Sequence, residues 1–305
     1  MGIKLVSYKD IDKEKWGNLV TKINPVKGQY ASYWYISAVT NKWSAFVLDD
    51  YIAAFPFAHV KKKGFDLVYQ PFYSRNFPFL GESNDEFISH IFQYFNNNYK
   101  HLDLNLFRQI NLPFLNKSKR VFQQLSLKED YKKIQLSFSK NAIRILKKNQ
   151  NLKVKTSSNL DSFITLFKTT VGEKLNYKTE NYNVLSSLIN NGLKENCIEF
   201  LKVECYGEVH AYGAFYFHKN VINFLKGAVT NQGKKTGAMF VLIDYMISKN
   251  CSSDKIFDFG GSNIESVSEF YKKFGSEDVL YYNYSFDNLP VVVKKLKKIR
   301  TRFLK

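Results

Sequence analysis

Apolar residues in the first 130 positions alternate between the spacing of helices and the spacing of strands. Over residues 85–97, Phe87, Ile91 and Phe95 fall on one helical stripe. Over residues 102–107, leucine occupies every second position, which predicts a strand with one buried face. The same patterns predict a helix that begins at Asp10 or Asp12 and ends near Lys22, and strands over residues 4–8, 44–49, 52–60 and 65–70.

The second half of the chain repeats this order, with turns that are easier to place. Gly207-Glu208 and Lys219-Asn220 mark hairpin turns. Strands are predicted over residues 152–156, 198–205, 209–218, 221–229, 255–259 and 279–284, and helices over 139–150, 161–171, 182–194, 237–249 and 264–274. An antiparallel meander that leads into a strand–helix–strand crossover predicts an α/β fold with a mixed sheet and helices on both faces. Because the first half resembles a diverged copy, we expect two tandem domains of one fold.

The positive charge is concentrated in two segments. The 305 residues contain 45 Lys and Arg against 27 Asp and Glu, a formal net charge of +18. Residues 117–155 hold twelve basic and two acidic side chains, and residues 290–305 hold seven basic and none acidic, so the rest of the chain nets only +1. This distribution indicates local anionic partners, such as nucleic acid, a phosphorylated ligand or an anionic membrane surface. Hydrophobic residues make up 45% of the chain, which excludes a largely disordered protein.

No apolar run is long enough for a membrane-spanning helix, and the sequence predicts a cytoplasmic protein with at most peripheral contact at the inner face of the membrane. Residues 289–305 combine apolar residues at helical spacing with lysines and arginines, a pattern typical of membrane-surface attachment. A terminal helix that docks on the protein body is the alternative. Cys197, Cys205 and Cys251 lack the spacing of a disulfide framework or a zinc site, so we predict buried, inert thiols and no metal.

Three segments of the second half have the composition of a binding site. Residues 233–238, Gly-Lys-Lys-Thr-Gly-Ala, lie between a strand and a helix, where small residues and unpaired N–H groups bind phosphate; a flexible basic turn is the alternative. Residues 257–263 end a strand with two glycines at the edge where ligands of open α/β sheets bind, although Ser262 or Asn263 can also cap the next helix. In residues 270–275, Tyr271 lies one step off the apolar stripe, facing either a cleft or solvent.

Together these segments resemble the GNAT acyltransferase superfamily. Lys234–Met239 resembles its pyrophosphate loop, with Lys in place of Gln or Arg and Met in the last small position. Residues 258–275 are similar to the D-F-x-G-S signature of the FemAB-like, or BioF2-like, branch, which has two GNAT-like halves. Residues 136–148 resemble the basic inter-domain helix of that branch. Gln70-Pro71-Phe72 resembles its first-half Q-P motif, with Arg75-Asn76 where two Gln residues are common.

The resemblance implies an acyltransferase with a tandem GNAT-like fold. The donor would be acyl-CoA (acetyl-CoA) or, by FemAB analogy, aminoacyl-tRNA, and the acceptor an amine such as a phosphorylated or lipid-linked cell-envelope or peptidoglycan precursor. The family tyrosine that protonates the leaving group corresponds to Tyr271, and the backbone of the fourth strand polarises the acyl carbonyl. The residues implied to bind the donor are Lys226, Gly227, Ala228, Lys234, Lys235, Thr236, Gly237, Ala238 and Asn263. Those expected to bind the acceptor are Gln70, Arg75, Lys140, Arg144, Gly260 and Ser262, and the candidates for general base are Glu204, His210 or a relayed water.

These patterns divide the chain into four parts and leave a second function open. We expect an N-terminal GNAT-like domain over residues 1–135, a basic connecting helix over 136–156, a C-terminal GNAT domain over 157–288 and a basic tail over 289–305. The basic stripe of the connecting helix is either a solvated face or a phosphate-binding surface. The alternative function is a non-catalytic protein that binds nucleic acid or another anionic polymer. Aromatic residues do not interleave with the basic runs, and no RNA-binding motif is present, which favours the enzyme.

Overall fold

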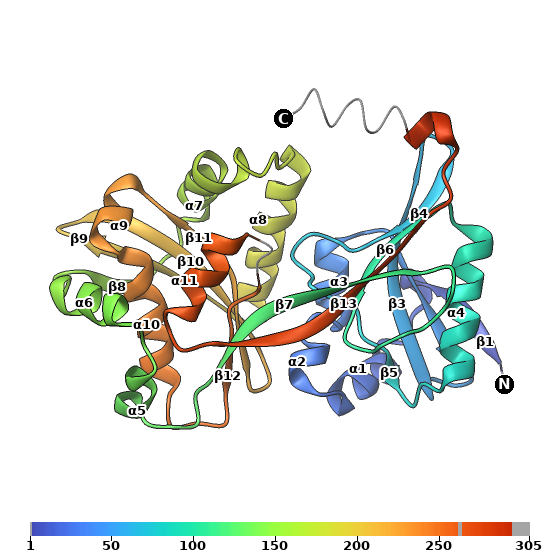
Figure 1. Cartoon of the computed structure of the whole chain (residues 1–305), viewed down its shortest axis with the longest axis horizontal. Coiled ribbons are helices and arrows are strands. Elements are labelled where there is room, and N and C mark those ends of the chain that lie inside the picture. The colour runs from blue at the N-terminus through green and yellow to red at the C-terminus, as the bar shows by residue number, and fades with distance from the viewer. Residues whose placement is uncertain (1, 262–263, 295–305) are drawn as a thin grey trace. The chain divides into compact units, whose positions relative to one another are not determined.

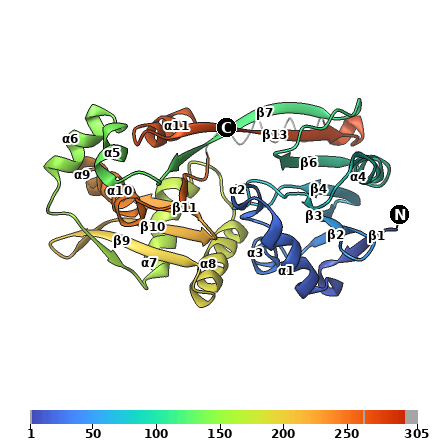
Figure 2. The same ribbon diagram turned by 90° about the horizontal axis from the view of Figure 1, so that it is seen from below.

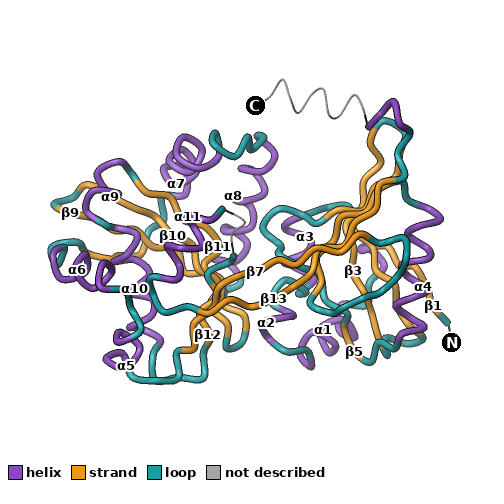
Figure 3. Tube along the Cα trace, viewed as in Figure 1, coloured by secondary structure: helices purple, strands orange, loops and turns teal. Residues whose placement is uncertain are grey.

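The computed structural model describes residues 2–261 and 264–294, which divide into two compact units (Figure 1). Unit 1 contains the residues up to Arg120 and those from Tyr281 onward, and unit 2 contains Val121–Leu280. This division differs from the expected boundaries after residues 135 and 288. The difference arises because two long strands, β7 (Asn116–Ser126) and β13 (Glu277–Asp287), each have residues in both units (Figure 3).

Unit 1 has the strand order β1-β2-β3-β4-β6-β13. All of these neighbours whose pairing is described are antiparallel, except that β4 and β6 are parallel. Its strands are β1 (Ile3–Ser7), β2 (Trp43–Leu48), β3 (Ala53–Lys62), β4 (Phe65–Tyr69), β5 (Leu80–Gly81, paired with β3) and β6 (His101–Leu106). Its helices are α1 (Lys13–Lys22), α2 (Pro25–Gly28), α3 (Tyr33–Val39) and α4 (Asp85–Asn98), with a 3₁₀ turn at Tyr8–Asp10.

Helix starts in unit 1 follow the capping residues. The Asp12 side chain accepts hydrogen bonds from two backbone N–H groups of α1, so of the two predicted starts the second is correct. Asn84 caps α4 in the same way. The predicted apolar stripe of α4 is buried in the core of unit 1, together with Trp16 and Trp43.

Unit 2 has the strand order β7-β12-β11-β10-β9-β8. Its own strands are β8 (Lys153–Thr156), β9 (Ile198–Cys205), β10 (Glu208–His218), β11 (Val221–Val229) and β12 (Ile256–Asp258). Its helices are α5 (Tyr131–Leu136), α6 (Lys140–Lys148), α7 (Leu160–Phe167), α8 (Thr179–Lys194), α9 (Asn231–Thr236), α10 (Ala238–Asn250) and α11 (Glu265–Lys272), with a π-helical turn at Lys168–Gly172. Helices α7 and α8 cover one face of the sheet, and α9, α10 and α11 cover the other (Figure 2).

The predicted α/β class with a mixed sheet and helices on both faces is confirmed, whereas α2, α3, α5, β5, β7 and α9 were not predicted. Strand β7 was not predicted. Its first residues are exposed and polar and show no apolar alternation, so the sequence pattern indicated only a basic segment there. Helix α9 occupies most of the segment expected to be a phosphate-binding loop. Of the predicted tail helix, residues 289–294 are described, and residues 295–305 lie outside the described part of the chain.

Candidate active site

Strands β11 and β12 separate at their carboxyl ends. Their parallel pairing runs from Val221 and Ile256 to Asn223 and Asp258. Strand β12 ends there, whereas β11 continues to Val229, so that within residues 2–261 and 264–294 no strand pairs with β11 on this side from Phe224 onward. The carboxyl ends of parallel strands are where open α/β sheets bind ligands.

A glycine turn leads the chain away from this edge. The fully buried Asp258 accepts a hydrogen bond from the N–H of Gly260 at 2.8 Å. Gly260 and Gly261 have φ values of 79° and 73°, in the region that favours glycine. A Cβ atom on Gly260 would lie 2.9 Å from the carbonyl oxygen of Phe224, and one on Gly261 would lie 2.7 Å from the Cβ of Phe122. Both glycines are therefore required for the strands to separate in this way.

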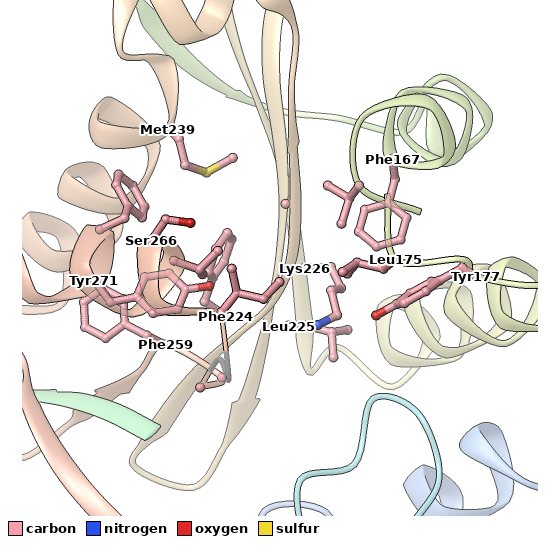
Figure 4. A pocket seen from close by; sticks show the side chains of 17 residues that line it. Phe167, Leu175, Tyr177, Phe224, Leu225, Lys226, Met239, Phe259, Ser266 and Tyr271 are labelled. Atoms are coloured by element: carbon pink, nitrogen blue, oxygen red, sulfur yellow. The ribbon is translucent and has the colours of Figure 1, made fainter. Parts of the chain in front are cut away.

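The separated strands open into a cavity of about 270 Å³ within unit 2. Strand β11 runs between two groups of lining side chains (Figure 4). On the side of α10 and α11 the labelled residues are Phe224, Met239, Phe259, Ser266 and Tyr271. On the side of α7 and the π-helical turn they are Phe167, Leu175, Tyr177 and Lys226. The cavity therefore reaches both faces of the sheet around the part of β11 that lies beyond its pairing with β12.

A β-bulge distributes the side chains of β11 between these two faces. Phe224 pairs with Phe215 of β10, and Lys226 pairs with the adjacent Ala214, so Leu225 is an extra residue on β11. In a regular strand, residues two apart face the same side of the sheet. Because of the bulge, Phe224 and Lys226 face opposite sides, in agreement with Figure 4.

Tyr271 reaches the cavity from α11. Its ring is buried and packs against Phe259 at 5.0 Å and Phe224 at 6.3 Å between ring centroids. Its hydroxyl points into the cavity (Figure 4). Burial, with a smaller contribution from the charge of Asp258, raises the pKa of this phenol above its usual value. The hydroxyl therefore carries its proton at neutral pH.

Lys226 is the only charged side chain among the described residues that line the cavity. Phe167, Leu175 and Tyr177 lie on the same side of the cavity (Figure 4). Burial lowers the pKa of the ammonium group because the charged form loses solvation. The sequence reasoning assigned Lys226 a role through its backbone, whereas the structure also places its side chain in the cavity.

The two candidate bases do not line the cavity. Glu204 on β9 forms ion pairs with Lys155 and Lys202, the second at 2.8 Å, and these interactions lower the pKa of its carboxyl group to about 2. His210 on β10 is buried, and its Nδ1 lies 3.0 Å from the hydroxyl of Thr236. His210 thus connects β10 to α9. Neither residue is among those that contact the cavity.

The segment predicted to bind pyrophosphate is helical. Several of its N–H groups bond within α9: that of Gly233 to the Thr230 hydroxyl at 2.9 Å, and that of Lys234 to the Thr230 carbonyl at 2.9 Å. Gly237 ends α9 with φ 69°, and its α-carbon packs against Ile145 of α6. Lys234 and Lys235 are exposed, and Ala238 is buried. Within α9 the N–H groups of Gly233 and Lys234 are thus used by the helix itself, and a phosphate-binding role for residues 237–239, at the start of α10, stays a prediction.

The equivalent strand edge in unit 1 is covered by the chain itself. Strands β4 and β6 are parallel as far as Tyr69 and Asp103, beyond which β6 continues. The Gln70 Oε1 accepts a hydrogen bond from the N–H of Asn105 at 3.2 Å, and the Asn105 side chain donates to the Arg75 carbonyl at 2.8 Å. Gln70 and Arg75 thus cover the edge of β6 in unit 1, whereas the corresponding edge of β11 in unit 2 borders the cavity.

The remaining predicted residues lie in different places. Gly227 and Gly260 line the cavity, and Ala228 is buried beside it on β11. Lys140 and Arg144 are exposed on α6 and do not contact the cavity. Ser262 and Asn263 lie outside the described residues. A second cavity, of about 380 Å³, lies within unit 1 and is lined by Phe77, Phe107 and Arg108 among others.

Sequence reasoning missed the aromatic and apolar walls of the cavity. Tyr177 follows a π-helical turn that no sequence pattern indicated, and such turns occur frequently at functional sites. Phe224 and Met239 are indistinguishable in sequence from core residues. In the described part of the chain, no group of three or more His, Cys, Asp or Glu side chains is arranged to hold a metal ion, and no helix is long and apolar enough to cross a membrane. The three cysteines are free and half-buried.

Comparison with solved structures identifies the fold. No family model and no curated protein matches the sequence. FemX has a TM-score of 0.64 at 12% identity, over 92% of this chain and 97% of that one. A tandem GNAT protein from the clavulanic acid biosynthesis pathway has a TM-score of 0.54 at 8% identity, over 95% and 99%. The L-PGS of Bacillus licheniformis has a TM-score of 0.52 at 15% identity, over 95% and 96%. This chain therefore has the tandem GNAT fold of the FemAB-like type.

Proposed function

We propose that this protein is an acyltransferase that moves an activated acyl group to an amine at the cavity of unit 2. The observation that carries the proposal is the separation of β11 from β12 beyond Asn223, where Phe224 and Gly227 of β11 line the same largely apolar cavity as Tyr271. The fold neighbours are named as a tandem GNAT protein, FemX and L-PGS, which supports a transferase. In unit 1 the corresponding edge is covered, so unit 2 is the half in which we place the transfer.

The chain's own groups support three parts of such a reaction. Backbone groups of Phe224 and Gly227, where β11 continues beyond its pairing with β12, would hold and polarise the acyl carbonyl. The apolar walls exclude water from the acyl group. The Tyr271 hydroxyl, protonated at neutral pH, would donate its proton to the leaving group. An acyl donor supplies the activated carbonyl.

Two donors remain for the proposal, acyl-CoA and aminoacyl-tRNA. The apolar lining on the side of Met239 and Phe270 fits an acyl chain or a pantetheine-like arm. The helical form of α9 offers fewer groups for a pyrophosphate than the sequence resemblance implied. Both donors present an activated acyl carbon. The proposal therefore specifies the reaction, and the experiment below identifies the donor.

The proposal is tested by substitution of the tyrosine. Transfer to a panel of amines would be measured with radiolabelled acetyl-CoA and, separately, with charged tRNA. We expect Tyr271→Phe to reduce kcat about 10²- to 10⁴-fold, as is typical for loss of a general acid, while donor binding measured by calorimetry is retained. The matched control is Tyr212→Phe, since Tyr212 is also buried among aromatic rings of unit 2 but does not line the cavity. Equal turnover of the two variants would remove Tyr271 from the mechanism.

We further propose that unit 1 attaches the protein to an anionic membrane surface. Val291 and Val292 are 67% and 68% exposed, an unusual state for two adjacent aliphatic side chains. The exposed lysines 61–63 form the end of the β3–β4 hairpin, which is connected to residue 288 through backbone hydrogen bonds of Lys100. Six further basic residues follow in the sequence after Lys294. Exposed valines beside lysines favour lipid over nucleic acid.

A further inference from the structure

The side of the cavity formed by α10 and α11 offers an apolar path for a substrate chain, since none of its described lining residues is charged (Figure 4). Two of its rings are held by aromatic neighbours. Phe259 packs on Tyr271 with ring centroids 5.0 Å apart, and Phe270 packs on Phe240 at 4.9 Å. Met239 is the one residue of α10 among the described residues that line the cavity. The wall therefore combines interlocked rings with one unbranched, flexible side chain from α10.

Met239 lies over the part of β11 at which we place the acyl carbonyl. A Cβ atom on Gly227 would lie 2.9 Å from the Met239 Cε and 2.6 Å from the Phe224 Cζ. The methionine methyl group and the phenylalanine ring therefore already fill the space above Gly227 on this face of the sheet. The Phe224 ring packs against Phe215 at 5.3 Å and against Tyr271 at 6.3 Å between centroids. Because Met239 is half-buried and unbranched, it is the part of this contact that can move.

We propose that this side of the cavity receives the acyl chain of the donor, and that Met239 limits the length of that chain. The proposal rests on the acyl transfer proposed above and names the class of acyl group that the same site transfers. A chain that is joined to a carbonyl at Gly227 and directed to this side meets the Met239 methyl within its first few atoms. Short acyl groups, such as acetyl and propanoyl, fit beside the methionine, whereas longer straight chains have to displace it. The acyl group that the wild type prefers is therefore short and apolar.

Substitutions of Met239 test this limit. Straight-chain donors from acetyl to octanoyl would be compared as CoA thioesters or, if tRNA is the donor, as tRNA esters of the corresponding straight-chain amino acids. Met239→Ala removes the Cγ, Sδ and Cε atoms. Because each buried methylene contributes about fourfold to binding, we expect this variant to raise kcat/KM for hexanoyl relative to acetyl about ten- to sixtyfold.

Two control variants separate the limit from a general effect on α10. Met239→Leu retains most of the side-chain volume and should keep the wild-type preference. Val241→Ala is the matched control, since Val241 is a half-buried residue of α10 that does not line the cavity. The proposed limit is overturned if Met239→Ala keeps the wild-type preference, or if Val241→Ala shifts the preference equally.

A binding measurement separates failure of this assignment from failure of the proposed function. Methionine labelled with ¹³C at its methyl group gives few NMR signals, because the full chain contains only 3 methionines, and the Met239 signal is identified by its absence in Met239→Leu. Acetone, 2-pentanone and 2-octanone present the carbonyl and chain of a donor without a leaving group. A shift of the Met239 signal, without a shift of Met246, which is buried on the same helix outside the cavity, supports the assignment even if no donor supports transfer. The assignment is overturned if 2-octanone leaves the Met239 signal unchanged or shifts both signals equally.

Discussion

Two roles are compared for Gly237. The sequence resemblance implied that it lets a ligand approach the backbone, whereas the structure indicates that it lets α6 pack against the backbone. It has φ 69°, and a Cβ atom there would overlap the Cγ2 methyl of Ile145 on α6. The left-handed conformation costs a non-glycine residue about 1–2 kcal/mol. Overpacking against Ile145 adds about 1–3 kcal/mol, nearer the lower value because Ile145 is half-buried and can move. We therefore expect Gly237→Ala to lower the free energy of unfolding of unit 2 by about 2–4 kcal/mol.

Matched variants separate the two contributions. Gly207 has φ 86°, and a Cβ atom there would have no other atom within 4 Å, so Gly207→Ala should show only the conformational cost of about 1–2 kcal/mol. Ile145→Leu removes the β-branched methyl that overlaps, whereas Ile145→Val retains it. In combination with Gly237→Ala, the leucine should therefore recover the steric part of the loss and the valine should not.

The assay has to report on unit 2 alone. All three tryptophans, Trp16, Trp34 and Trp43, belong to unit 1, so their fluorescence follows the stability of that unit and serves as the control. Native-state hydrogen exchange of amides in α10 would give the free energy of opening beside Gly237. Equal losses for Gly237→Ala and Gly207→Ala, or no recovery with Ile145→Leu, would refute the packing argument. Loss of donor binding without loss of stability would restore the ligand-approach role.

Two further predictions follow from charges outside the cavity. Because its ion pairs lower the folded-state pKa of Glu204 to about 2, from an ordinary value of 4.5, the stability that Glu204 contributes is present above pH 4.5 and is lost as the pH falls toward 2. The stability difference between wild type and Glu204→Gln, measured by denaturation from pH 7 to pH 2.5, should therefore shrink over that interval, and a constant difference would contradict the assignment. Removal of residues 290–305 should abolish most sedimentation with vesicles containing phosphatidylglycerol, while phosphatidylcholine vesicles bind neither form and tryptophan fluorescence is unchanged; equal sedimentation of both forms would exclude the proposed attachment.

Most of the fold follows from short-range patterns in the sequence. Asp12, Asn84 and Ser139 each cap the helix that they precede, and the three strands of the second-half meander are found within one residue of their predicted ends. Strand β7 was missed because its pairing with β12 depends on residues more than 100 positions away and leaves little local alternation. The unit boundaries shifted for the same reason, since only pairing shows that β13 returns to β6.

Residues that line the candidate cavity were predictable where backbone geometry demands a particular residue, and less so elsewhere. Gly260 marks the turn at which the strands separate, because its φ of 79° favours glycine, and Tyr271 lies one step off the apolar stripe of the helix that follows. Glu204 and His210 were singled out by chemistry alone, and the structure uses their side chains to hold β9 to β8 and β10 to α9. No local pattern reveals such contacts, because they join segments distant in the chain.

The two units differ in whether the chain itself covers one strand edge, that of β6 in unit 1 and that of β11 in unit 2. In unit 1 the side chain of Gln70 takes the place of a neighbouring strand by accepting a hydrogen bond from the N–H of Asn105, so this backbone donor is already used within the protein. In unit 2 the Asp258–Gly260 hydrogen bond turns the chain away from the edge of β11, where we propose that the acyl donor binds. Catalysis of acyl transfer needs preorganised backbone donors that no other part of the protein uses. The open edge of unit 2, more than any individual side chain, is therefore the feature on which the proposed reaction depends.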